Sequence, residues 1–173
     1  MKLSTQLKKF DACTEGYEWA KGKTLTEAWS TCERGDWMLW YAAKINIDRK
    51  LLVRAACACA RLALRFVPEG EDRPRIAIET AEASAEGKAS IEDVKHAAAY
   101  AAYAAADAAD AAAFAAAHAA FAAAHAAHAA YAAAHAANAA YAAADAAAYT
   151  TTLRVCAEIA KDIIPLDALK GDK

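Results

Sequence analysis

"AAAHAAFAAAHAAHAAYAAAHAANAAYAAADAAAY", residues 115–149, is the stretch that decides the fold, because alanine has the highest helix propensity of all residues. It belongs to a longer tract, residues 97–148, in which 38 positions are alanine and 14 are not. From Tyr100 to Tyr149 the other residues recur at steps of three or four, with a mean of 3.5. This is the period of helices that wind around neighbouring helices. The tract therefore predicts helix, packed against other helices through close alanine faces.

The length of the tract argues against one straight helix. A helix over residues 91–149 would be about 90 Å long, whereas a compact chain of this size has a radius of gyration of about 16 Å. We therefore expect two or three helices that fold back on each other, with breaks that alanine does not mark. An extended rod, or a homo-oligomer formed through the tract, is the alternative.

The residues before the tract also show helical spacing and carry start and stop signals. Gly16 is expected to break the first helical patch, Arg34-Gly35 to end a later helix, and Pro68 to end the amphipathic helix that runs to Phe66. Capping or first-turn signals mark five helix starts: Thr24 with Glu27, Asp36, Asp48, Pro74, and Ser90 with Asp93.

These signals together predict an all-α fold. We expect a multi-helix bundle in which long alanine-rich helices pack closely in the C-terminal half. The chain is predicted to be one domain over residues 1–173, with amphipathic helices over 1–89, the alanine-rich helical tract over 90–165 and a tail over 166–173.

Composition argues against several classes of protein. The net charge is −2, from 20 basic and 22 acidic residues, so no overall field attracts nucleic acid or an anionic membrane, and we expect neither partner. No apolar run resembles a signal peptide or a membrane span. The five cysteines are odd in number and are expected to be reduced thiols, which is typical of the cytoplasm.

The histidines of the tract raise the question of a metal site. His125 and His128 are three residues apart, so both rings can reach one ion on a helix face. No carboxylate or thiol nearby in the sequence completes the set, so these two are weak candidates. We expect His, Tyr, Asn and Asp to act as polar spacers between alanine helices, and we expect no metal and no cofactor.

Two charged segments are the better candidates for a binding site. One spans residues 34–40 and the other the turn and helix start at 69–79. Solvated ion pairs and helix caps are the ordinary explanation of such charges, and a patch that recognises a partner is the functional one. The candidate residues are Arg34, Asp36, Trp37, Trp40, Glu71, Asp72, Arg73, Arg75 and Glu79.

No catalytic constellation stands out, so we expect no enzyme and assign no catalytic residue. A Ser/His/Asp arrangement, a pair of catalytic carboxylates and a glycine-rich phosphate loop are all missing from the sequence patterns. A cleft that brought His96 against Glu79 or Asp107 would favour the opposite conclusion.

Several stretches resemble one known family. They are "CERGDWMLWYAAK" (32–44), "IDRKLLVRAACACARLALRFVPEGEDRPRIAIETAEASAEGKASIEDV" (47–94), the alanine-rich tract and "LRVCAEIAKDIIP" (153–165), and they are similar to the Imm-5-like immunity proteins of bacteria and their phages. The motifs RGDWMLW and VPEGEDRPR followed by an alanine-rich tract carry most of the likeness. The resemblance implies a small cytoplasmic protein that binds and neutralises a protein toxin, with no agreed catalytic residues to transfer.

Two functions are therefore compared. The first is a non-catalytic helical protein that neutralises a cognate toxin. The alternative is a helical protein that binds a small molecule or nucleotide, in which Arg34, Arg73 and Arg75 meet an anionic ligand beside Trp37 or Trp40. The alternative requires a pocket that joins the two charged segments.

Overall fold

A computed structural model of the chain describes residues 2–67, 69–107 and 146–170. These residues form α-helices and short 3-10 helices joined by turns, with no strand among them, which confirms the all-α class. In chain order the elements are α1 (Leu3–Lys9), α2 (Thr14–Ala20), α3 (Leu25–Thr31), α4 (Gly35–Lys44), α5 (Arg49–Arg61), η1 (Leu64–Phe66), α6 (Arg73–Ala85), α7 (Ile91–Asp107), α10 (Ala146–Ile163) and η2 (Leu166–Lys170).

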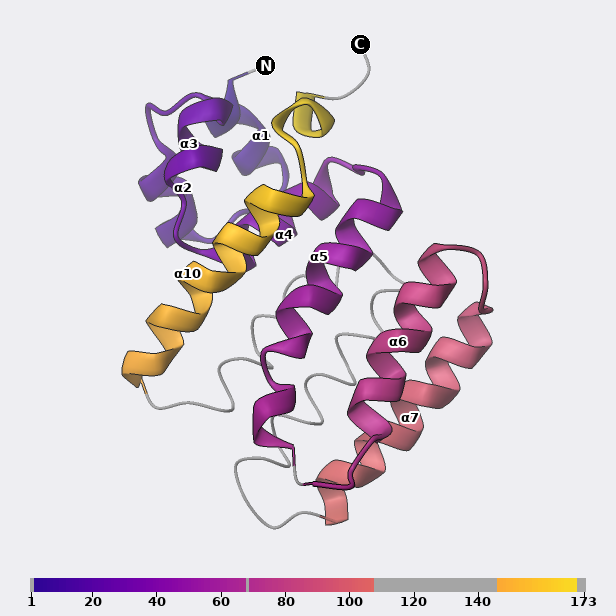
Figure 1. Cartoon of the computed structure of the whole chain (residues 1–173). Coiled ribbons are helices and arrows are strands. Elements are labelled where there is room, and N and C mark those ends of the chain that lie inside the picture. The colour runs from indigo at the N-terminus through magenta and orange to yellow at the C-terminus, as the bar shows by residue number, and fades with distance from the viewer. Residues whose placement is uncertain (1, 68, 108–145, 171–173) are drawn as a thin grey trace.

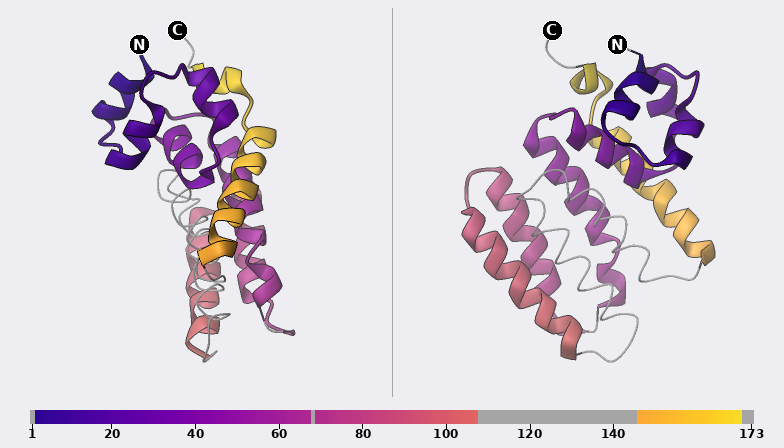
Figure 2. Two further views of the ribbon diagram at one scale, coloured as in Figure 1. Left: turned by 90° about the vertical axis from the view of Figure 1, so that its left-hand side faces the viewer. Right: turned by 180° about the vertical axis from the view of Figure 1, so that it is seen from behind.

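The long helices lie side by side in one row, in the order α10, α5, α6 and α7 (Figure 1). Each helix of the row runs antiparallel to its neighbour, and Figure 2 shows the same row from behind. The short helices α1, α2 and α3 gather at the end of the row where α10 finishes and α5 begins. Helix α4 packs against both α10 and α5, so it connects the N-terminal helices to the row.

Helix α5 lies at the centre of the core, because its two sides contact different helices. Its apolar residues are almost all buried, and many of them are alanines that let the neighbouring helices approach closely. The Cys57 thiol lies 3.9 Å from the carbonyl oxygen of Ile78 in α6, and the Cys59 thiol lies 3.9 Å from that of Cys156 in α10. The two thiols therefore point to opposite sides of α5 and pack in the core, and all five cysteines are free.

The first turn of α4 touches the backbone of α10 at Gly35. A Cβ atom built on this glycine would lie 2.5 Å from the Cβ of Cys156 and 2.7 Å from the backbone nitrogen of Ala157. Real side chains do not approach so closely, so only a residue without a Cβ fits this crossing. Gly35 thus sets the position of α4, which carries Trp37 and Trp40 toward the N-terminal helices.

Most of the helix starts predicted from the sequence are confirmed. The Thr24 hydroxyl accepts a hydrogen bond from the Glu27 backbone N–H, and the Glu27 carboxylate accepts one from the Thr24 backbone N–H at 2.8 Å, which completes a capping box. Ser90 and Asp93 make the same reciprocal pair before α7. Asp48 caps α5 by accepting from the Lys50 N–H at 2.8 Å, and a proline lies in the first turn of α6.

Three boundaries near the N-terminus were predicted wrongly. Gly16 lies inside α2, and the chain breaks earlier, where Asp11 adopts a left-handed backbone with φ of 54° that aspartate tolerates and a helix does not. Gly35 begins α4 instead of ending the preceding helix, which stops at Thr31. Asp36 consequently lies in the first turn of α4 instead of capping it.

Later parts of the chain show further differences. Helix α5 ends at Arg61, before the predicted Phe66, and the chain continues as η1. The predicted tail includes η2, in which Leu169 is 4% exposed and joins the main core. Helices α7 and α10 lie on opposite sides of α5 and α6 (Figure 1), so these two ends of the alanine-rich region do not belong to one straight helix. The packing and oligomerisation predicted for the tract fall mainly on residues 108–145, outside the described residues.

Candidate functional site

The predicted binding residues lie in two separate places. Residues 34–40 belong to α4 and its cap, beside the N-terminal helices. Residues 71–79 include the start of α6, which lies at the opposite end of the row, where α5 finishes (Figure 1). No residue of 69–79 lines the cavity beside α4. The described residues therefore do not form the single pocket between Arg34 and Arg73 that the small-molecule alternative required.

Arg34 is held by its neighbours in the first turn of α4. Its Nε donates to Asp36 Oδ1 at 2.9 Å, and its Nη2 donates to Asp36 Oδ2 at 2.7 Å. The guanidinium also lies over the Trp37 ring, 4.3 Å from the centroid, and 3.5 Å from a carboxylate oxygen of Glu15. Its positive charge is thus compensated within the protein, which favours a role in positioning α4 over the capture of an anion.

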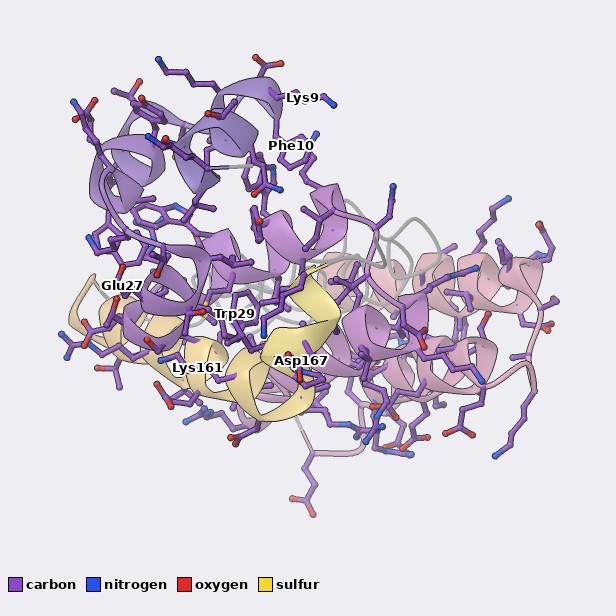
Figure 3. The ribbon with its side chains drawn as sticks, turned by 90° about the horizontal axis from the view of Figure 1, so that it is seen from above. Lys9, Phe10, Glu27, Trp29, Lys161 and Asp167 are labelled. Carbon is purple, nitrogen blue, oxygen red and sulfur yellow. The ribbon has the colours of Figure 1, made fainter. Side chains whose placement is uncertain are left out.

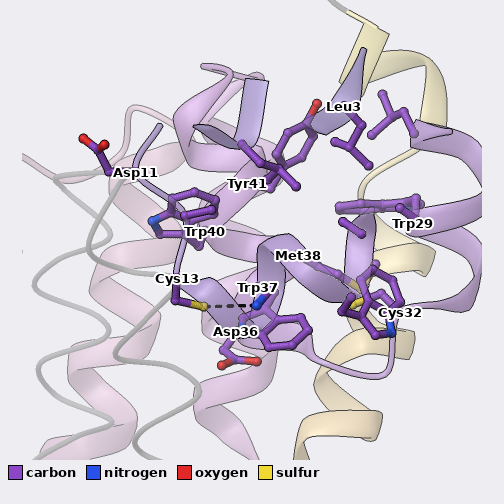
Figure 4. Close-up of a pocket in the computed structure, with 17 residues that line it drawn as sticks. Leu3, Asp11, Cys13, Trp29, Cys32, Asp36, Trp37, Met38, Trp40 and Tyr41 are labelled. Atoms are coloured by element: carbon purple, nitrogen blue, oxygen red, sulfur yellow. Dashed lines mark hydrogen bonds between the residues drawn. The ribbon is translucent and has the colours of Figure 1, made fainter. Parts of the chain in front are cut away.

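A cavity of about 380 Å³ lies between the N-terminal helices and α4 (Figure 4). All four tryptophans of the chain line it: Trp19, Trp29, Trp37 and Trp40. Leu3, Leu7, Met38 and Tyr41 supply further apolar surface. Seen from above, Trp29 points to the interior whereas Glu27 lies on the outer side of α3 (Figure 3). Sequence reasoning named only the α4 part of this site, although the crowding of tryptophan between residues 19 and 40 was a signal for the rest.

An ion pair between Glu71 and Arg73 orders the start of α6 and contacts α7. The Arg73 Nε donates to a Glu71 carboxylate oxygen at 2.8 Å, and the Arg73 backbone N–H donates to the same carboxylate at 3.0 Å. Chiefly through the side-chain hydrogen bond, Arg73 holds the pKa of Glu71 below its usual range. The Arg73 guanidinium also lies over the Tyr100 ring of α7, 5.5 Å from the centroid. The turn is therefore fixed to the helix row.

A second set of ion pairs lies at the same place, next in sequence to an exposed apolar residue. Arg75 donates to Glu79 at 2.9 Å and lies 2.9 Å from Asp72. Ile76 is 43% exposed and Tyr100 is 60% exposed, which is unusual for large apolar side chains in this protein. We call this group the α6 cluster; it comprises Glu71, Asp72, Arg73, Arg75, Ile76, Glu79 and Tyr100. The structure thus brings together all the predicted residues of the second segment, and adds Ile76 and Tyr100, which sequence reasoning missed.

Comparison with known families gives a match over residues 44–168, to the model described as "Imm-5 like putative immunity protein". The match covers more than half of the chain. The chain belongs to this Imm-5-like family. No curated protein matches it, and no solved structure does.

The matched region of this Imm-5-like protein contains one of the two candidate sites and not the other. The α6 cluster lies within residues 44–168, whereas every residue that lines the cavity precedes residue 44. The family resemblance inferred from the sequence is therefore confirmed, and it covers the α6 cluster but not the cavity.

The sequence also raised the questions of a metal site, a catalytic pair at His96 and a membrane-spanning helix in this Imm-5-like protein. In the described ranges, no group of three or more His, Cys, Asp or Glu side chains could hold a metal ion, and His125 and His128 lie outside those ranges. His96 is exposed, and its Nε2 lies 3.8 Å from a carboxylate oxygen of Glu92. Among the helices described, none has the length and apolar character needed to cross a membrane.

Proposed function

We propose that this Imm-5-like protein is a non-catalytic immunity protein, which binds a cognate protein toxin in the cytoplasm of the producing cell and neutralises it. Membership of the family supports the immunity role. The observation that carries the binding proposal is the α6 cluster, where the Arg73 guanidinium of α6 lies over the ring of the exposed Tyr100 of α7, and the exposed Ile76 follows three residues later in α6.

The chemistry of the α6 cluster suits recognition of a protein. Arginine and tyrosine are enriched among the residues that dominate the free energy of protein–protein binding. Tyr100 offers an open aromatic surface, and its neighbour Arg73 is already oriented by Glu71. Because these side chains are largely fixed before the partner arrives, little conformational entropy is lost on binding.

The charges of the cluster suit specificity. Glu71, Asp72 and Glu79 are paired with Arg73 or Arg75 within the cluster, so its three acidic groups are largely compensated by its two basic ones. Such a surface does not attract polyanions or polycations in general, but it matches a partner whose charges alternate in the complementary order. Solvent-exposed pairs contribute little to stability, typically about 0–1 kcal/mol, so stability alone does not account for this arrangement.

The test begins with the genes that flank this one. Each flanking open reading frame is expressed alone in a heterologous host, and those that stop growth are co-expressed with this chain. We expect the chain to restore growth against one of them and to form a complex with its product. If no flanking product is toxic and rescued by this chain, the proposal is contradicted.

Variants then assign the surface. Arg73→Ala combined with Tyr100→Ala is expected to weaken the complex about 30-fold or more, which is the effect of losing a residue that dominates an interface. Arg154→Ala is the matched control, because Arg154 pairs with Glu33 at 3.0 Å on the side of the molecule away from α7. Equal affinities for the double variant and the control would refute the role of the α6 cluster.

A further inference from the structure

The cavity beside α4 has the size and lining of a small-molecule site. Its volume of about 380 Å³ lies in the lower part of the range of about 300–1,000 Å³ that such sites occupy. Its walls are mostly aromatic and aliphatic, and the rings come from different helices, with Trp19 in α2, Trp29 in α3 and Trp40 in α4. Figure 4 shows Trp29 and Trp40 on opposite sides of the space, so a ligand between them would contact aromatic surface on both sides.

The same tryptophans supply indole N–H donors that could bond to a ligand. Within residues 2–67, 69–107 and 146–170, no indole N–H donates a hydrogen bond to a protein acceptor. Trp29 is only 7% exposed, so little of this residue is open to bulk water. A buried donor of this kind costs free energy unless an acceptor reaches it. A ligand that carries acceptor atoms would recover that cost.

The charges around the cavity disfavour an ionic ligand of either sign. Asp11 and Asp36 line the cavity and no lysine or arginine does, which disfavours an anion such as a nucleotide phosphate. A cation meets the opposite obstacle, because protein cations already lie over the aromatic rings of the lining. Lys23 lies 4.5 Å from the Trp19 ring centroid and Lys44 lies 5.8 Å from that of Trp40.

We propose that this cavity binds a neutral, planar aromatic or heteroaromatic small molecule that carries hydrogen-bond acceptors. The ligand would stack among the tryptophans and accept from one or more indole N–H groups. The site is separate from the α6 cluster, which lies at the other end of the helix row, and from the region that the family match covers. Binding at this site adds a function beyond recognition of a toxin.

The experiment uses three probes with one bicyclic ring system on the full chain. Quinoline is neutral at pH 7.5 and has an acceptor nitrogen, naphthalene has the same shape without an acceptor, and N-methylquinolinium has the same rings with a positive charge, an added methyl group and no acceptor. The indole ¹H–¹⁵N resonances of the four tryptophans report binding directly, because all four residues line the cavity. We expect saturable shifts with quinoline, at an affinity about five-fold or more above that of naphthalene, which is the factor one hydrogen bond contributes. N-methylquinolinium is expected to bind more weakly than quinoline.

The other outcomes overturn the proposal. Equal affinities for quinoline and naphthalene would show an apolar cavity that does not recognise the acceptor atom. A higher affinity for N-methylquinolinium than for quinoline would show a cation site. The absence of saturable shifts up to the solubility of quinoline would show that the cavity takes no such ligand.

A filled cavity gives a second test. Ala28→Leu places a larger side chain in the lining, and Ala99→Leu places the same side chain on an exposed position of α7. We expect Ala28→Leu to lose quinoline binding at least ten-fold while circular dichroism shows an unchanged helix content, and Ala99→Leu to bind as the wild type does. If Ala28→Leu instead loses toxin protection and the wild type never binds quinoline, the cavity receives a side chain of the protein partner and the proposal is wrong.

Discussion

Replacing Gly35 with alanine tests whether α4 is positioned by its close contact with α10. The added Cβ would lie 2.5 Å from the Cβ and 2.6 Å from the carbonyl carbon of Cys156, and both distances are below the closest approach that real side chains show. The atoms that would have to move are backbone or attached directly to it, so no rotamer change relieves the clash. Overpacking of this kind costs about 1–3 kcal/mol, and the clash with backbone places Gly35→Ala at the upper end.

The gain in helix propensity opposes this cost only in part. Glycine to alanine in a helix interior gains about 1 kcal/mol, and Gly35 is the first residue of α4, where the gain is smaller. We therefore expect Gly35→Ala to lower the free energy of unfolding by about 2 kcal/mol. The measurement is urea denaturation followed by far-ultraviolet circular dichroism, with the midpoint compared at constant slope.

Two matched variants make the result specific to the crossing. Gly16→Ala also changes a helical glycine, but its Cβ would meet the Cys13 sulfur at 3.3 Å and the Trp37 ring at 3.6 Å, so a change of less than about 0.5 kcal/mol is expected. Cys156→Ala keeps the Cβ and should not rescue Gly35→Ala, because the clash does not involve the thiol. A stability of Gly35→Ala equal to that of Gly16→Ala would refute the reasoning.

Three further predictions follow from local contacts. Thr24→Ala removes the acceptor that caps α3 and should cost about 1 kcal/mol of stability in urea denaturation, whereas Thr26→Ala, inside α3 and without a capping role, should not. The pKa of Glu71 is lowered in the folded state, so its pair with Arg73 stabilises the protein above the ordinary pKa of glutamate, and this stabilisation is lost as the pH falls through the lowered value. Wild type and Glu71→Gln should therefore differ in free energy of unfolding at pH 7 and converge at acid pH. A difference in free energy of unfolding that stays constant with pH would contradict this. Burial raises the pKa of the Cys57 thiol to about 12, and the hydrogen bond with Cys156 together with burial raises the pKa of Cys59 well above its ordinary value. At pH 8 a thiol reagent should therefore label only the exposed Cys13 quickly and the four buried cysteines only on unfolding.

The sequence predicted the features that depend on neighbouring residues. The capping box at Thr24 and the cap at Asp48 are formed by side chains that reach two or three residues along the chain, so their spacing is enough to recognise them. The opposite directions of Cys57 and Cys59 follow in the same way from the geometry of one helix. The pairing of Arg73 with Glu71 is also local, which is why the charged turn was identified correctly as one group.

Features that depend on distant contacts were missed or misread. Gly35 resembles a helix stop in the sequence, and its actual role becomes visible only when α10 lies against it. The four tryptophans line one cavity because helices α1 to α4 fold together, and the spacing of residues along the chain does not predict that. Arg34 and Arg73 looked like the two halves of one anion site, yet each is paired with its own carboxylate, and the helix row keeps them at opposite ends.

The separation of the two sites has a consequence for how this protein works. The α6 cluster and the cavity share no residue and lie at opposite ends of the row, so a ligand in the cavity does not contact the α6 cluster itself. Among the described helices, α5 connects the two sites, because it packs against α4 at one end and against α6 along its length. Because α5 is bounded by buried alanines and thiols with little free space, a shift of α4 by a ligand would be resisted by the core. We therefore expect toxin affinity to be the same with and without saturating quinoline, and a change greater than about three-fold would show that the row transmits movement from one site to the other.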